Sequence, residues 1–138
     1  MADAYVFNEH LNNDDRATIE AILHAAGYNP RYDVPNDVSS IDAHTDIGVV
    51  ALPAASQDVG TIDVRTMAFA GAGIRVVAIW LRVDEDATGC VPESIGKYAT
   101  TVDRDSDTLT LTLKGETDVW EQPGGEETPK PHTKRNKC

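Results

Sequence analysis

The sequence predicts a three-layer α/β domain in which a short central parallel sheet is flanked by helices. Two largely apolar runs, Ile47–Leu52 and residues 74–81, lack polar alternation, which is typical of strands covered on both faces of a parallel sheet. Between them, residues 56–72 are rich in Ala and Gly and predict a helix. Strand, helix and strand within so short a stretch form a βαβ unit, so we expect the two strands to be parallel.

The amino-terminal third predicts a further strand and an amphipathic helix. Residues 4–7 form a short apolar run, and residues 12–15 are of the types that cap helices. The apolar side chains at 19, 22, 23 and 26 recur at the spacing of one helical face. Gly27 follows this pattern directly, which is typical of the residue after a helix end.

The remaining elements are shorter. Residues 28–34 predict a brief second strand, interrupted by Pro30. Residues 93–99 predict a short helix, followed by a last strand at 100–102. Residues 107–114 alternate Thr and Leu like a half-buried strand, yet Ser106 and Gly115 on either side are typical of helix boundaries, so both interpretations remain open.

Composition and charge exclude several functions. The chain has 138 residues and a formal net charge of −11, which fits one domain and argues against nucleic-acid binding and attraction to anionic lipid. No apolar run approaches the length of a membrane span, and the amino-terminus does not look like a signal peptide. The two cysteines lack metal-ligand spacing. We therefore expect a cytoplasmic protein without a membrane partner, metal or disulfide scaffold.

The carboxyl-terminal segment differs from the rest. We expect a folded domain over residues 1–120 and a flexible tail over residues 121–138, because Pro and Gly accumulate there with little apolar content. Residues 130–138 hold four of the 12 basic residues and no acid, whereas residues 1–129 hold 8 basic against 23 acidic side chains, or −15. The charge of the tail is therefore opposite to that of the domain, and the tail is expected to contact acidic surfaces.

The order of the elements over residues 4–102 resembles a bacterial TIR-like domain and, more loosely, the nucleoside deoxyribosyltransferase-like proteins. The resemblance rests on four segments of the sequence: the first strand with Asn8, Glu9 and His10; Ala25-Ala26-Gly27-Tyr28; residues 46–52 followed by Ser56; and residues 68–80. It implies a flavodoxin-like fold. It also implies a hydrolase or transferase that binds or processes NAD or a related nucleotide at the N-glycosidic bond, in bacterial antiphage or stress signalling, with no further cofactor.

The same resemblance directs attention to a carboxylate on the helix between the two central strands. The position of the family's glutamate falls on or near Arg65, and the nearby acid is Asp63. Ligands of open α/β sheets bind at the carboxyl ends of the strands, which adds the polar residues after the first strand and Ser56. The expected catalytic residues are Asp63 and Glu9, and the expected substrate-binding residues are Asn8, His10, Ser56 and Arg65.

Each of these residues also has a plain structural interpretation. Asp63 is suited to a helix amino-terminal turn through the helix dipole, Arg65 to surface charge, and Ser56 to helix capping. A non-catalytic protein-interaction module on the same fold, with a protein partner or a second copy of the chain, is therefore the alternative function. A carboxylate in a pocket beside the ends of the first strand and Ile47–Leu52 would favour the nucleotide enzyme.

Overall fold

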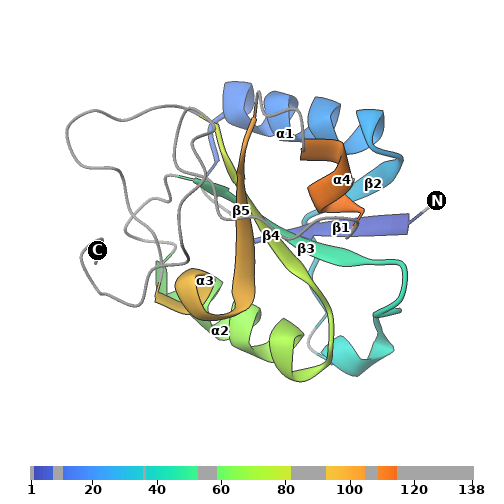
Figure 1. Cartoon of the computed structure of the whole chain (residues 1–138), viewed down its shortest axis with the longest axis vertical. Helices are drawn as coiled ribbons and strands as arrows, with labels where there is room; N and C mark the ends of the chain where they lie inside the picture. The colour runs from blue at the N-terminus through green and yellow to red at the C-terminus, as the bar shows by residue number, and fades with distance from the viewer. Residues whose placement is uncertain are drawn as a thin grey trace.

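In a computed structural model of the chain, a five-stranded sheet lies between two layers of helices (Figure 1). The structure describes residues 2–7, 11–35, 37–52, 59–81, 93–104 and 109–114. The strands are β1 (Ala2–Val6), β2 (Tyr28–Arg31), β3 (Ile47–Leu52), β4 (Val76–Trp80) and β5 (Ala99–Asp103). The helices are α1 (Asn13–Ala25), the 3₁₀ helix η1 (Val38–Ser40), α2 (Val59–Gly71), α3 (Glu93–Tyr98) and α4 (Leu109–Leu113).

The strands follow the order β2-β1-β3-β4-β5, and every neighbouring pair is parallel. This is the flavodoxin-like strand order, so the predicted fold class is confirmed. The two apolar runs are adjacent central strands, with Gly48 opposite Val76 and Leu52 opposite Trp80. Pro30 lies inside β2, where its missing N–H is tolerated because β2 is an edge strand.

Local sequence signals explain why α1 begins and ends where it does. The Asn12 side chain accepts a hydrogen bond of 2.7 Å from the backbone N–H of Asp15 and caps the first turn. Ile19 and Leu23 are fully buried against the sheet. Gly27 has a φ of 87°, a left-handed conformation that glycine adopts without strain. The predicted helix and its end are therefore confirmed.

The sheet separates two apolar cores. α1 and α4 cover one face, and α2 and α3 cover the other (Figure 1). On the second face, Phe7 and Phe69 pack edge to face with 4.8 Å between their ring centroids. Gly48 leaves room for both rings, because a Cβ at this position would lie 2.6 Å from Phe7 and 3.0 Å from Phe69.

The segment with two open interpretations is a helix, α4. Its carboxyl-terminal carbonyls receive donors from distant elements. The two terminal nitrogens of Arg75 donate to Thr112 (3.2 Å) and Leu113 (2.8 Å), and the Tyr28 hydroxyl donates to Leu113 at 2.7 Å. Carbonyls at a helix end lack partners within the helix, so these long-range hydrogen bonds stabilise the helical form.

The connection from β2 to β3 is unusual for this strand order. Its described residues, 32–35 and 37–46, contain the three-residue helix η1 and no α-helix. Asp37 caps η1 by accepting from the backbone N–H of Ser39 at 3.0 Å. Beside β1 and β2, the side of the sheet that faces α2 is therefore bordered by this irregular segment.

Some expectations fall on residues outside the described ranges. They concern the tail at 121–138, residues 8–10 after β1, and the residues that join β3 to α2. The boundary between domain and tail stays a prediction. No helix in the described ranges combines the length and the apolar character that crossing a membrane requires.

Candidate functional site

The structure places two of the six expected site residues. Asp63 and Arg65 both lie on α2. Asn8, Glu9, His10 and Ser56 lie outside the described residues, so their roles stay predictions. The carboxyl edge of the sheet, where they were expected to meet, is therefore described only in part.

Asp63 links α2 to α3. Its Oδ1 atom accepts hydrogen bonds from the backbone N–H of Ser94 at 3.0 Å and from the Ser94 hydroxyl at 2.5 Å. Ser94 is the second residue of α3, so Asp63 provides an acceptor for an N–H of the first turn. The expectation that Asp63 sits in the first turn of its own helix is wrong, because α2 begins at Val59 and has no acid in that turn.

Arg65 is half-buried on α2 and interacts with its surroundings. It is therefore more than the exposed surface charge of the plain interpretation. Neither Arg65 nor Asp63 lines the hollow that lies beside β1 and the end of β2.

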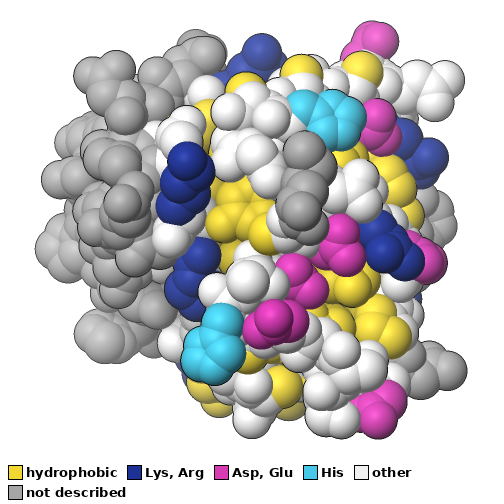
Figure 2. Space-filling view, turned by 90° about the vertical axis from the view of Figure 1, so that its right-hand side faces the viewer, with side chains coloured by type: hydrophobic (Ala, Val, Ile, Leu, Met, Phe, Trp, Pro, Cys, Tyr) yellow, Lys and Arg dark blue, Asp and Glu magenta, His cyan; other side chains and the backbone are white. Residues whose placement is uncertain are grey.

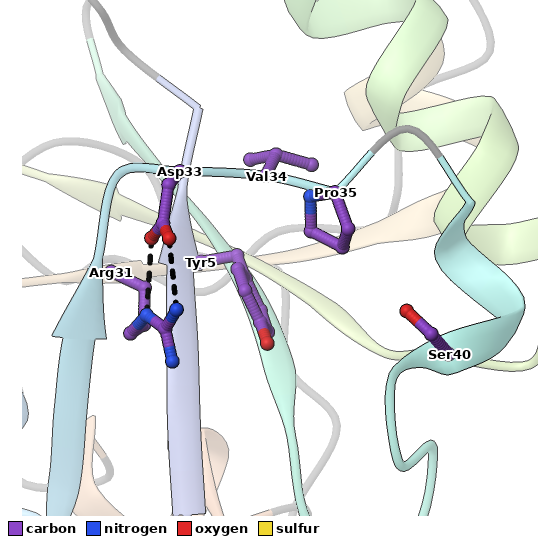
Figure 3. A pocket seen from close by; sticks show the side chains of 6 residues that line it. All are labelled: Tyr5, Arg31, Asp33, Val34, Pro35 and Ser40. Carbon is purple, nitrogen blue, oxygen red and sulfur yellow. Dashed lines mark hydrogen bonds and ion pairs between the residues drawn. The ribbon is translucent and has the colours of Figure 1, made fainter.

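A hollow of about 420 Å³ lies beside β1 and the end of β2. Figure 3 shows the Tyr5 ring between an Arg31–Asp33 pair on one side and Pro35 and Ser40 on the other. Tyr5 comes from β1, Arg31 ends β2, and the other lining residues belong to the connection towards β3. The hollow therefore exists because an irregular segment with η1 occupies this side of the sheet. Its lining residues are Tyr5, Arg31, Asp33, Val34, Pro35 and Ser40.

Arg31 and Asp33 form a two-pronged ion pair. Arg31 Nε lies 3.0 Å from Asp33 Oδ1, and Nη2 lies 2.8 Å from Oδ2. The hydrogen bonds from Arg31 lower the pKa of Asp33, and the carboxylate in turn raises the pKa of Arg31. Asp3 adds a weaker contact at 3.4 Å from Arg31 Nη1. The guanidinium is thus held by two carboxylates of the chain.

Tyr5 presents an aromatic ring and a neutral hydroxyl to this site. Burial raises the pKa of Tyr5, and the nearby carboxylates of Asp3 and Asp46 raise it further. The Arg31 guanidinium, 5.8 Å from the ring centroid, opposes this shift. The phenol therefore stays protonated at neutral pH and can donate a hydrogen bond.

The charge around the hollow is mixed, with an excess of acid. Asp46 accepts a 2.9 Å hydrogen bond from the backbone N–H of Asp3, which brings these carboxylates together beside Arg31 and Asp33. On the face drawn in Figure 2, acidic side chains gather near the centre, next to basic side chains and apolar surface. An anionic ligand would compete with Asp33 and Asp3 for Arg31. The hollow is better suited to a neutral ring or a hydrogen-bond donor.

Sequence reasoning missed this hollow although a signal was present. Asp3 and Tyr5 alternate along β1, and Asn29, Arg31 and Asp33 alternate along β2 and its continuation. Alternation with a period of two places these side chains together on one face of the sheet. Pro30 interrupts this segment and made the alternation of Asn29, Arg31 and Asp33 difficult to recognise.

The described residues hold no group of three or more His, Cys, Asp or Glu side chains arranged to bind a metal ion. No protein-family model, curated protein or solved structure matches the chain. The class of the protein is therefore defined by its fold: a flavodoxin-like α/β domain.

Proposed function

We propose that the chain is a non-catalytic protein-interaction module on a flavodoxin-like domain. The observation that carries this proposal is the position of Asp63, the leading candidate for a catalytic carboxylate. It accepts two hydrogen bonds from Ser94 and supports the first turn of α3. Two large apolar side chains of the same helix, Val64 and Met67, are exposed, as expected for a helix that contacts another protein.

Cleavage of an N-glycosidic bond needs a carboxylate close to the anomeric carbon. If Asp63 turned towards a substrate, the Ser94 N–H and hydroxyl would lose their acceptor. Because Asp63 and Ser94 are both substantially removed from solvent, an unsatisfied donor there would oppose the rearrangement. This cost favours a packing role for Asp63.

A TIR-like domain that binds or processes NAD or a related nucleotide is the second candidate function. The hollow beside β1 favours it, since the Tyr5 ring and the Arg31 guanidinium border a space that a ligand can enter. The register sets Tyr5 level with Gly48, near the amino end of β3, so this hollow is separate from the carboxyl edge of the central strands. A nucleobase could stack on Tyr5, and Glu9 would then be the carboxylate that remains from the predicted pair.

The two functions are separated by incubating the pure protein with NAD and a panel of nucleosides and measuring the released base by chromatography. The interaction module is expected to release none. Release that is lost in Glu9→Gln but kept in Asp63→Asn would contradict the proposal and assign the chemistry to Glu9. Release that is lost in Asp63→Asn, with an unchanged melting temperature, would restore Asp63 as a catalytic residue.

A further inference from the structure

The outward face of α2 is uncharged along its whole length. Its exposed residues are Gly60, Thr61, Val64, Met67, Ala68 and Gly71. Val64 is 66% exposed and Met67 is 55% exposed, so two large apolar side chains stand in solvent on one helix. A single exposed apolar residue is common on protein surfaces, whereas adjacent ones on one helix face suggest a contact surface.

The charged side chains of α2 lie outside this face. A quarter of all residues are charged and the net charge is −11, yet the 13 residues of α2 include only Asp63 and Arg65 as charged side chains. Both are half-buried, and Asp63 is directed to Ser94. Neither therefore interrupts the uncharged face.

The intervals between the residues of this face are the same when they are counted from either end of the helix. Gly60, Val64, Met67 and Gly71 are separated by four, three and four positions, which places them on one side of the helix. If two such helices pack antiparallel about a two-fold axis, Val64 of each copy meets Met67 of the other. Gly60 then meets Gly71 at both ends. A face of this kind is complementary to itself, as two-fold interfaces require.

We infer that α2 is a dimerisation helix and that its partner is α2 of a second copy of this chain. The inference rests on the proposed interaction function and names its partner. Two chains of net charge −11 repel each other, so they approach at least cost through a surface without charge.

The size of the face sets the strength of the dimer. A 13-residue helix is roughly 20 Å long, and one helix pair covers less than the standard interface of about 800 Å² per partner. The dimer is accordingly weak and reversible. Added salt strengthens it, because salt screens the repulsion between the two acidic bodies.

Sedimentation equilibrium of the full chain, from low concentration up to about 1 mM and at two salt concentrations, tests the inference. Val64→Lys and Met67→Glu place charges in the middle of the face. Each alone is expected to raise the dissociation constant roughly tenfold or more. Ala21→Lys is the matched control, since it adds the same charge as Val64→Lys at an exposed position of α1, on the opposite layer. It is expected to leave the constant unchanged or to lower it slightly.

Mixing the two single variants tests the antiparallel geometry. In a mixed pair, Lys at position 64 of one chain faces Glu at position 67 of the other, so association is expected to recover towards the wild-type level. A parallel pair brings no such charges together. The helical signal in circular dichroism checks that all variants fold. We expect them to fold, because the side chains of Val64 and Met67 are both exposed.

Three results would overturn the inference: a wild-type chain that stays monomeric over the whole range, equal effects of Val64→Lys and Ala21→Lys, or no recovery in the mixture. Release of base from NAD would contradict the proposed function alone. A dimer that persists in such a protein would still confirm the role of α2.

Discussion

The two halves of the sheet differ in what covers them, although their strands are parallel and continuous. In the centre, every residue of β3 and β4 is buried. In the other half, formed by β1 and β2, the side chains of Ala4, Val6 and Tyr28 are buried on the face that α1 covers. Their other side carries Asp3, Arg31 and the hydroxyl of Tyr5 beside a hollow.

The difference follows from the connections between the strands. α2 joins β3 to β4 and places Ile62 and Phe69 against the central strands. The described part of the β2–β3 connection has only η1 at the corresponding place. The identity of the covering segment, more than the strand itself, therefore decides whether a strand face is apolar or polar. Four changes of side chain or pH test this comparison.

Phe69→Ala should have the largest effect. Phe69 is fully buried and contacts Phe7 and Tyr5 with centroid distances of 4.8 Å and 6.1 Å. Removing the ring leaves a cavity over the centre of the sheet, so we expect the free energy of unfolding to fall by about 3–5 kcal/mol. Urea denaturation followed by circular dichroism measures this change.

A variant in the β1–β2 half of the sheet serves as the comparison. Tyr5→Phe keeps the ring and removes only the hydroxyl beside the hollow, so its effect on stability should be much smaller than that of Phe69→Ala. If both variants lost the same stability, the hollow would be as important to folding as the central core, and the contrast between the halves would be wrong.

Asp63→Ala should have an intermediate effect, since it removes the acceptor for the first turn of α3. Loss of a helix-capping carboxylate costs about 0.5–2 kcal/mol, and the half-buried position of Asp63 places it within this range. A double-mutant cycle with Ser94→Ala measures the coupling between the two side chains. Strictly additive effects would show that the hydrogen bond from the Ser94 hydroxyl to Asp63 contributes nothing to stability.

Alkaline pH should weaken the β1–β2 half through its tyrosines. Burial and a 2.9 Å hydrogen bond to Glu20 raise the pKa of Tyr32, and burial raises that of Tyr5. In the unfolded chain both ionise near pH 10. The stability that depends on the neutral phenols is therefore complete below pH 10 and is lost as the pH rises through the folded-state values.

Denaturation at increasing pH, with Tyr32→Phe as the comparison, isolates one of these groups. The variant should lose less stability than the wild type above pH 10. Equal losses in the two proteins would mean that Tyr32 ionises in the folded state as easily as in the unfolded state.

The Arg31–Asp33 pair should give the smallest change in stability, because the Asp33 side chain is 71% exposed and surface ion pairs contribute little. The pKa of Asp33 is lowered in the folded state. The contribution of the pair to stability is therefore complete above the ordinary carboxyl pKa near 3.9, and it is lost as the pH falls through the folded-state pKa. Nuclear magnetic resonance titration should find Asp33 below the ordinary value in the wild type and close to it in Arg31→Ala. An ordinary value in both would show that the pair does not persist in solution.

Local patterns in the sequence were sufficient for the central elements. The apolar runs predicted β3 and β4 because burial on both faces requires apolar side chains at successive positions. The spacing of Ile19 and Leu23 predicted α1 because one helix face contacts the core. Both signals depend on chain neighbours, and both strand directions followed from the βαβ connection.

The tertiary structure alone decided three other points. Residues 109–113 are a helix because Arg75 and Tyr28, distant in sequence, donate to its last carbonyls. Asp63 accepts hydrogen bonds from Ser94 because α3 is brought next to α2, across 31 positions of the chain. The hollow exists because the β2–β3 connection lies beside Tyr5 and Arg31. Each depends on contacts between remote segments, which hydrophobic periodicity does not encode, since it reports only that a side chain is buried and not which group it meets.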